Sequence, residues 1–132
     1  MIFNLSCMID THCHLEQTYY QKDRDTVIAR CKEELNAIIT SSSNPENFKL
    51  TMKIVERYRG FVFASASIHP EYVINISRNE IDDHIELMKK NKANIVAIGE
   101  TGLDYWWIKN KKLRERQKEL TIQFINLAKY LK

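Results

Sequence analysis

Two histidines near the start of the chain have the spacing of metal ligands. The segment IDTHCHLE, residues 9–16, places His12 and His14 two positions apart after a short apolar run. Residues two apart in a β-strand point to the same side, with Cα atoms about 6.6–7 Å apart, so both imidazoles can be directed at one ion. Cys13 is then expected to face away, while Asp10 can orient a ligand or bind weakly. Two polar residues at a strand end would show the same spacing.

Glu100 is the residue that most favours a metal site. It ends the apolar run NIVAIGE, residues 94–100, directly after Gly99. An unpaired carboxylate is costly to bury there, whereas beside cations it becomes useful because it can bridge two metal ions. A carboxylate bonded to the following loop is the alternative. We predict that His12 and His14 bind a divalent metal together with Glu100.

Other candidates follow the third and fourth apolar runs. His69 stands in SIHPE, where Pro70 favours an extended conformation just past the third run. It can contact a substrate phosphate there, although an ordinary loop histidine fits equally. The YWW segment, residues 105–107, offers aromatic faces that can stack on bases, or a hydrophobic lid. His84 lies in a polar stretch of a helical pattern, and we expect it at the surface.

A basic run follows the aromatic segment. KNKKLRERQK, residues 109–118, has six basic residues against one acid. Such a run can bind a phosphodiester backbone, and a solvated helix start is the alternative. Basic residues at a helix start oppose the helix macrodipole, so this run is not explained by helix stability.

The elements that must position these residues alternate between short apolar runs and helical patterns. Asn44 followed by Pro45 marks one helix start, and Ser77 with Glu80 fits a capping box at another. The predicted strands are residues 7–10, 35–42, 61–66 and 94–100. The predicted helices are residues 23–34 and 45–60, a helix that opens at Ser77 with Ile81, Ile85 and Met88 on one side, and residues 111–132. Strands without clear in-out alternation predict a parallel sheet, either open and doubly wound or half of a barrel. His-Cys-His in place of a glycine-rich loop after the first strand favours the half barrel.

Composition narrows the function classes. With 132 residues, 44% of them hydrophobic and 28% charged, the chain fits one globular domain. A net charge of +3 creates no global field for nucleic acid or membrane. The apolar stretches are far shorter than the roughly 20 residues of a membrane span, and the start lacks a signal-peptide pattern. The 3 cysteines lack zinc-like spacing and predict reduced thiols in a cytosolic protein.

Four segments together resemble the TatD family of metal-dependent hydrolases, the TatD-type deoxyribonucleases. They are IDTHCHLE at the first strand, IHPE after the third, IGETGLDYWW at the fourth and RERQKELTIQFINLAKYL in the last helix. The first and third are specific together, because other amidohydrolase-like families share His-x-His without the GE-x-GLDY segment. The resemblance makes residues 1–7 an expected extension and residues 8–132 the N-terminal half of the family's barrel.

The resemblance implies a TIM-type (β/α)8 barrel, of which this chain is a (βα)4 half, with two divalent metal ions at the strand ends. It implies that His12 and His14 bind one ion (Zn²⁺, Mn²⁺ or Mg²⁺) and that Glu100 bridges both ions and is catalytic. The implied reaction is phosphodiester hydrolysis of DNA in the cytoplasm. Substrate contacts are expected from His69, Asp104, Tyr105, Trp106, Lys111 and Arg114.

The chain departs from the family pattern at single positions and in length. Glu71 replaces the second histidine of an HPH segment, Thr121 stands where an aromatic is usual, and Trp106 replaces a tyrosine or histidine. Barrels of this kind need about 250 residues. The family's later segments supply two more histidines and an aspartate, so the site in this chain is expected to be incomplete.

Three functional hypotheses therefore stay open. The chain is a deoxyribonuclease-type hydrolase, a catalytically incompetent half that needs a complementary half-barrel, or an amidohydrolase-type enzyme acting on another ester or amide. Half a barrel leaves its first and fourth strands as unpaired edges and exposes inward apolar residues such as Val96 and Ile98. We expect such a chain to self-associate.

Overall fold

The computed structural model describes residues 8–131, so the expected extension, residues 1–7, lies outside the described residues. Four strands alternate with four α-helices, as predicted. The order is β1 (Ile9–Cys13), α1 (Arg24–Glu34), β2 (Ala37–Ser42), α2 (Pro45–Arg57), β3 (Val62–Ala66), α3 (Arg78–Lys90), β4 (Ile95–Ile98) and α4 (Lys111–Leu131), with short 3-10 turns at Thr18–Tyr20, Pro70–Ile74 and Lys92–Asn94.

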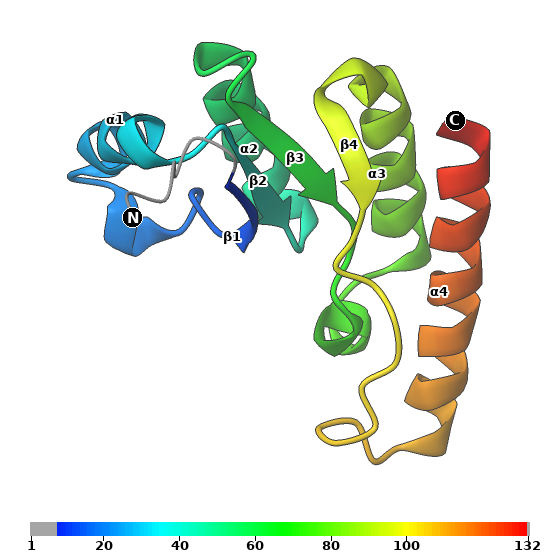
Figure 1. Cartoon of the computed structure of the whole chain (residues 1–132). Coiled ribbons are helices and arrows are strands. Elements are labelled where there is room, and N and C mark those ends of the chain that lie inside the picture. Colours follow the sequence, from blue (N-terminus) through cyan, green and yellow to red (C-terminus); the bar gives the residue numbers. More distant parts are fainter. Residues whose placement is uncertain (1–7, 132) are drawn as a thin grey trace.

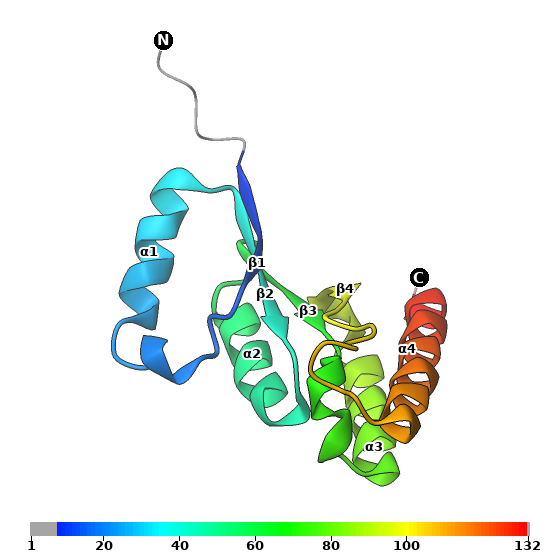
Figure 2. The ribbon, with the colours of Figure 1, turned by 90° about the horizontal axis from the view of Figure 1, so that it is seen from below.

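The strands form one parallel sheet in the order β1-β2-β3-β4. A doubly wound sheet reverses its strand order and carries helices on both faces. Here the order follows the sequence, and the helices lie in an arc along one face of the curved sheet (Figures 1 and 2). Each strand therefore returns by a helix on the same side, as in a barrel wall. The fold is half of a TIM-type barrel, which settles the choice between the two architectures.

Local capping signals begin two of the helices where the sequence predicts. The Asn44 side chain accepts a hydrogen bond from the backbone N of Asn47, with Pro45 at the first helical position. Ser77 and Glu80 form a reciprocal capping box at the start of α3. Both caps satisfy backbone N–H groups that a helix start leaves without partners.

Two hydrophobic clusters fill the space between the sheet and the helices. One lies under α1 and α2, around Ile28, Ile38 and Val62. The other lies between β3, β4 and the helices α3 and α4, where the apolar face of α4 packs. Its fully or nearly fully buried members include Phe48, Ile68, Met88, Leu120, Phe124 and Leu127.

The prediction that His84 lies at the surface is wrong. The residue is 2% exposed and packs edge-to-face against Phe48, with ring centroids 5.1 Å apart. Its position explains this, because Ile81, His84 and Met88 follow one another at helical spacing and share the buried face of α3. Polar neighbours in the sequence concealed a histidine that belongs to the apolar stripe.

The fourth strand differs from its prediction in length and in exposure. β4 ends at Ile98, so Glu100 lies in the loop beyond the strand. Val96 is 53% exposed, as expected for an uncovered edge, whereas Ile98 packs against the core between the sheet and α4. Ile98 was predicted to face the open side and instead faces the helices. Within residues 8–131, no helix is both long enough and apolar enough to cross a membrane.

Candidate metal centre

His12, His14 and Glu100 come together at the carboxyl end of the sheet. The Oε1 atom of Glu100 lies 2.8 Å from Nε2 of His12 and 3.1 Å from Nε2 of His14. One ligand atom from each residue falls within 4.8 Å of the others. The two imidazole rings stand nearly perpendicular, with centroids 5.2 Å apart. Donor atoms from two distant parts of the sequence are thus aimed at one point, since His12 and His14 lie at the end of β1 and just past it, and Glu100 lies in the loop after β4.

Cys13 faces away from the two histidines, as strand alternation predicts. Asp10 does not contact an imidazole ring as expected. Cys13 turns toward the core, and burial, with smaller contributions from Asp10 and Glu16, raises the pKa of its thiol to about 12. Asp10 accepts a hydrogen bond from the backbone N of His12 at 2.9 Å. It therefore holds the strand that carries His12 rather than orienting an imidazole ring.

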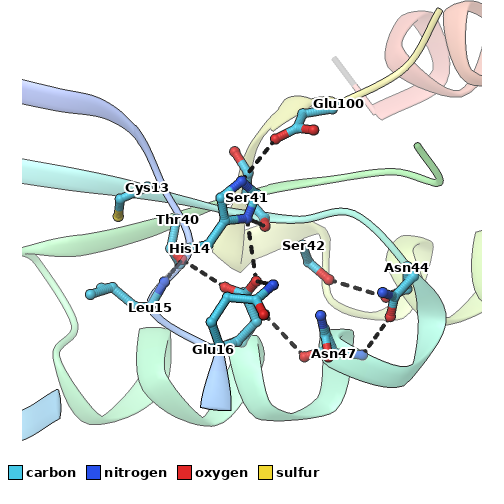
Figure 3. Close-up of polar contacts among 12 residues, drawn as sticks. Cys13, His14, Leu15, Glu16, Thr40, Ser41, Ser42, Asn44, Asn47 and Glu100 are labelled. Carbon is cyan, nitrogen blue, oxygen red and sulfur yellow. Dashed lines mark hydrogen bonds and ion pairs between the residues drawn. The ribbon is translucent and has the colours of Figure 1, made fainter. Parts of the chain in front are cut away.

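The surroundings of His14 determine which of its ring nitrogens carries the proton and which presents a lone pair to Glu100 (Figure 3). Its Nδ1 atom lies 2.9 Å from the carbonyl oxygen of Ser41 on β2. A carbonyl can only accept, so Nδ1 must carry the proton. In the neutral ring, Nε2 is then unprotonated and presents a lone pair toward Glu100, which is the state in which imidazole binds a metal.

Glu100 reaches this point because Gly99 allows a close backbone approach. The Ser65 hydroxyl donates to the carbonyl oxygen of Gly99 at 2.8 Å, which ties the β4 loop to β3. A Cβ atom on residue 99 would stand 3.1 Å from the Ser65 hydroxyl oxygen, closer than most side chains tolerate. Glycine at this position lets the loop fold back on β3 and turn the Glu100 side chain toward the histidines.

The surroundings of Glu100 Oε1 indicate that His12, His14 and Glu100 are suited to hold a cation. Glu100 Oε1 is buried and has no hydrogen-bond partner within the described part of the chain, although both histidine Nε2 atoms lie close to it. A carboxylate oxygen facing an imidazole lone pair is repelled unless a cation or a proton lies between them. Two imidazole nitrogens and a carboxylate oxygen suit Zn²⁺ or Mn²⁺. The residues present therefore fit a divalent metal.

His69 reaches the same centre with the opposite ring orientation. Its Nδ1 atom accepts a hydrogen bond from the backbone N of Glu71 at 3.3 Å, so the neutral ring carries its proton on Nε2. That Nε2 lies 3.7 Å from Oε2 of Glu100. His69 thus faces the centre as a hydrogen-bond donor, which suits contact with an anionic oxygen better than direct metal binding.

An open pocket of about 450 Å³ adjoins Glu100 and His69. The predicted substrate residues Asp104, Tyr105 and Trp106 line it together with the intervening loop, residues 101–103. Trp106 is 75% exposed, so one predicted stacking platform is available to a ligand. The structure therefore gathers five of the predicted site residues, beginning with Glu100 and His69, around one hollow.

Several predicted substrate residues also shape the loop itself. Asp104 Oδ1 accepts from the backbone N atoms of Trp106 and Trp107, and the Arg114 guanidinium donates to the carbonyl oxygens of Ile108 and Tyr105. Arg114 also stacks over the Tyr105 ring, with 4.4 Å between its guanidinium carbon and the centroid. Lys111 is exposed at the start of α4 and does not line the pocket.

Sequence patterns gave no sign of the residues that hold this site from behind. Gln117 is fully buried in α4, accepts from the backbone N of Asp104 and donates to the carbonyl oxygen of Pro70. Glu16 is also buried, beneath His14. Such residues can be recognised only when helical or strand spacing assigns an amide or a carboxylate to a core position.

Comparison with known proteins agrees with the fold and with a metal-dependent hydrolase family. The family model of TatD related DNase matches residues 9–132. An uncharacterized metal-dependent hydrolase of Buchnera aphidicola is 40% identical over 114 residues, covering 82% of this chain and 41% of that protein. The human deoxyribonuclease TATDN3 is 29% identical over 133 residues, covering 94% of this chain and 48% of that protein.

A solved structure gives the same result in three dimensions. The crystal structure of the TatD homologue YjjV from Escherichia coli superposes with a TM-score of 0.81 at 26% identity, covering 96% of this chain and 48% of that one. The chain thus spans about half the length of the relatives it matches. Its matched segment carries the strand-end histidines and Glu100, and the chain belongs to the TatD-related DNase family of metal-dependent hydrolases.

Proposed function

We propose that this chain supplies the N-terminal half of a metal-dependent phosphodiesterase that hydrolyses DNA. The observation that carries the proposal is the buried Oε1 atom of Glu100, which lacks a hydrogen-bond partner among residues 8–131 and faces two histidine nitrogens. Family membership and relatives named as deoxyribonucleases support the substrate class.

His12, His14 and Glu100 would hold the metal. When bound, a divalent ion supplies Lewis acidity that makes a water easier to deprotonate near neutral pH and polarises a phosphoryl oxygen. Two ions are expected from the family, with Glu100 shared between them. The carboxylate of Glu100 offers a second oxygen, Oε2, on the side of His69, which suits a bridging role.

The substrate side of the site would be formed by His69 and the aromatic loop. The Nε2–H group of His69 can donate to a phosphodiester oxygen next to the metal centre. Trp106 offers an exposed ring on which a base can stack, and such stacking is worth roughly 1–3 kcal/mol per base. Asp104 and Arg114 would act by holding this loop, and Lys111 would attract the backbone by its charge.

Metal binding tests the proposal most directly. Calorimetric titration of the chain with Zn²⁺, Mn²⁺ and Mg²⁺ should show binding that the double variant His12→Ala/His14→Ala loses. Glu33→Gln, at an exposed position of α1, is the matched control and should bind as the wild type does. Equal binding by the double variant would contradict the assignment of these ligands.

DNA binding tests the substrate class separately. Lys111 and Lys112 are exposed, so replacing both with glutamine should flatten the dependence of single-stranded DNA affinity on salt. For each phosphate that a lysine no longer neutralises, the logarithmic slope should fall by about 0.7. An unchanged slope would show that these lysines do not contact DNA and are only solvated residues at a helix start. DNA that binds without being cleaved in the presence of metal would favour a half that needs a complementary half for activity.

The uncovered edge of the sheet favours that second candidate function. Val96 and Ala97 of β4 are exposed, and a hollow of about 310 Å³ lies between this strand and Ala128 and Leu131 near the end of α4. Unpaired strand edges and apolar hollows bind other chains. We propose that the chain associates through this edge with a complementary half-barrel or with a second copy of itself.

Light scattering at micromolar concentration tests association. The wild-type chain should form dimers or larger species, and Val96→Lys should shift it toward the monomer because a charge on the edge opposes strand pairing. A wild-type chain that remains monomeric and melts cooperatively would contradict this proposal. A second copy would repeat the same three ligands, so association alone should not raise DNA cleavage.

A further inference from the structure

Glu16 is a buried carboxylate on the far side of His14 from Glu100 (Figure 3). Its side chain is 0% exposed, and its Oε1 atom lies 3.3 Å from Nδ1 of His14. The proton on that Nδ1 atom, which the Ser41 carbonyl requires, therefore points into a region with two acceptors, one neutral and one anionic. His14 thus lies between two carboxylates, with one at each ring nitrogen.

Thr40 clamps this carboxylate from β2. Its hydroxyl donates to Oε2 of Glu16 at 3.2 Å and accepts from the backbone N of Leu15 at 2.9 Å. The side-chain amide of Gln17 donates to Oε1 at 3.3 Å. Thr40 is 0% exposed, so the hydroxyl has little freedom to turn away. Both oxygens of Glu16 are consequently held in fixed positions beneath the imidazole.

The charge of Glu16 is unexplained by the stability of the fold. Within residues 8–131 its ion-pair partner is His14, and the nearby Arg24 donates instead to the carbonyl oxygens of Leu15 and Gln17. Burying a carboxylate without a permanent cation is costly, and a glutamine oxygen could accept the same bond from Thr40. A carboxyl group at this buried position, where a glutamine would serve the fold, needs a reason in the chemistry of the site.

We infer that Glu16, clamped by Thr40, is a positioning residue that orients His14 and strengthens it as a metal ligand. The Nδ1–H group bonds to the Ser41 carbonyl, and a carboxylate 3.3 Å from the same nitrogen favours that tautomer by its charge and raises electron density at Nε2, the atom directed at Glu100. Part of the Glu16 charge is balanced when a cation binds on the other side of the ring. This inference rests on the proposed metal centre, and it assigns Glu16 no direct contact with the ion.

Zinc affinity is the first measurement. Calorimetry with Zn²⁺ alone should show roughly tenfold to hundredfold weaker binding for Glu16→Gln, the usual cost of losing such a carboxylate. The exposed Glu33→Gln variant is the control for loss of one negative charge and should bind as the wild type does. Thr40→Val should weaken binding in the same direction, whereas Thr40→Ser keeps the hydroxyl and should bind zinc nearly as the wild type does.

The second measurement uses the metal-free protein, so that it does not depend on zinc. In nitrogen-edited NMR spectra, the wild type should show His14 as the Nδ1–H tautomer, with a slowly exchanging proton. Glu16→Gln and Thr40→Val should broaden that proton signal or mix the two tautomers. A residue that only stabilised the fold would lower the melting temperature of these variants and leave the His14 signals unchanged.

The outcomes separate this inference from the proposed function. Wild-type zinc affinity together with unchanged His14 signals in Glu16→Gln overturns the inference and leaves the metal centre intact. Failure of the wild type itself to bind zinc overturns the proposed function, and the metal-free spectra then decide the role of Glu16 alone. If Glu16→Gln does not fold, the Thr40→Val and Thr40→Ser pair decides, and equal behaviour of that pair overturns the inference.

Discussion

His14 and His84 are both histidines enclosed by the fold, yet their surroundings differ in every polar contact. His14 has a carbonyl and a carboxylate at Nδ1 and a second carboxylate at Nε2. His84 is more deeply buried, and neither of its ring nitrogens has a well-aligned hydrogen-bond partner among the described residues, although the Ser67 backbone lies near the ring. The first region is a polar network across three strands, whereas the second is an apolar core that contains an imidazole.

The difference shows that burial alone does not make a histidine a candidate for function. In the His14 region, β2 and β3 contribute hydroxyls and carbonyls that hold the loops carrying the ligands. In the His84 region, the neighbouring Ser67 hydroxyl also lacks a partner in the described chain. Satisfied polar groups fix a geometry, while unsatisfied ones cost stability. The predictions below test this contrast, beginning with the largest effect.

Acid should destabilise the fold through His84. Burial lowers the pKa of His84 from 6.5 to about 4, with the Ser67 backbone opposing the change weakly. The folded state therefore favours the neutral ring. The contribution of this preference to the free energy of unfolding is complete above pH 6.5 and is lost as the pH falls toward 4. One pKa unit corresponds to about 1.4 kcal/mol, so the shift from 6.5 to about 4 predicts that the free energy of unfolding falls by about 3 kcal/mol in acid. Denaturant unfolding at stepped pH measures it.

His84→Met separates this effect from the protonation of carboxylates, which also destabilises proteins in acid. The free energy of unfolding of this variant should exceed that of the wild type by an amount that grows from pH 6.5 to pH 4. At pH 7 the variant should be as stable as the wild type or more so, because it removes two unpaired ring nitrogens. A difference that stays constant with pH would show that His84 is protonated normally in the fold.

Two buried threonines test the polar network of the other region. Thr40 and Thr51 are both 0% exposed. Thr40 bridges Leu15 and Glu16, whereas the Thr51 hydroxyl donates to the Asn47 carbonyl one helical turn earlier. Thr40→Val strands a buried amide and a carboxylate oxygen and should cost about 1–3 kcal/mol. Thr51→Val should cost less than about 1 kcal/mol, and equal costs measured by chemical denaturation would remove the distinction.

Much of the fold could be predicted because its signals are local. Asn44 with Pro45 and the Ser77 capping box each act within a few residues, and both appear as predicted. The boundary at Ile98 could not be predicted, because Gly99 still bonds to β3 beyond it, through its N–H to the Ala66 carbonyl and through its carbonyl to the Ser65 hydroxyl. Those contacts depend on a neighbouring strand.

The candidate site also contains residues that local sequence predicts and residues that only the packing of the fold reveals. Spacing and residue type predicted that His12, His14 and Glu100 act together, and the structure brings their ligand atoms within 4.8 Å of one another. Glu16 and Thr40 were missed because their roles arise from packing between β1 and β2, where each appears as an ordinary polar residue. Arg114 was predicted to contact phosphate from its place in a basic run, and only the folded loop shows its bonds to Ile108 and Tyr105.

Two serines near the end of β3 offer the smallest and sharpest test of the contrast. Ser65 and Ser67 lie two positions apart, and both are buried. Ser65 donates to Gly99, so Ser65→Ala should cost about 1 kcal/mol and loosen the loop that carries Glu100. Ser67 has an unpartnered hydroxyl within the described residues, so Ser67→Ala removes an uncompensated polar group and should be neutral or slightly stabilising.

The two variants remove the same atom from neighbouring positions of one strand end, so each is the control for the other. Zinc affinity adds a second readout, because Ser65→Ala should weaken it by loosening Glu100, while Ser67→Ala should leave it unchanged. Equal losses of stability in both variants would mean that the Ser67 hydroxyl is satisfied, for example by a bound water, and that the His84 region is less apolar than its contacts indicate. A stable Ser67→Ala variant beside a weakened Ser65→Ala variant would show that a buried hydroxyl at this strand end stabilises the fold where it has a partner and costs stability where it has none.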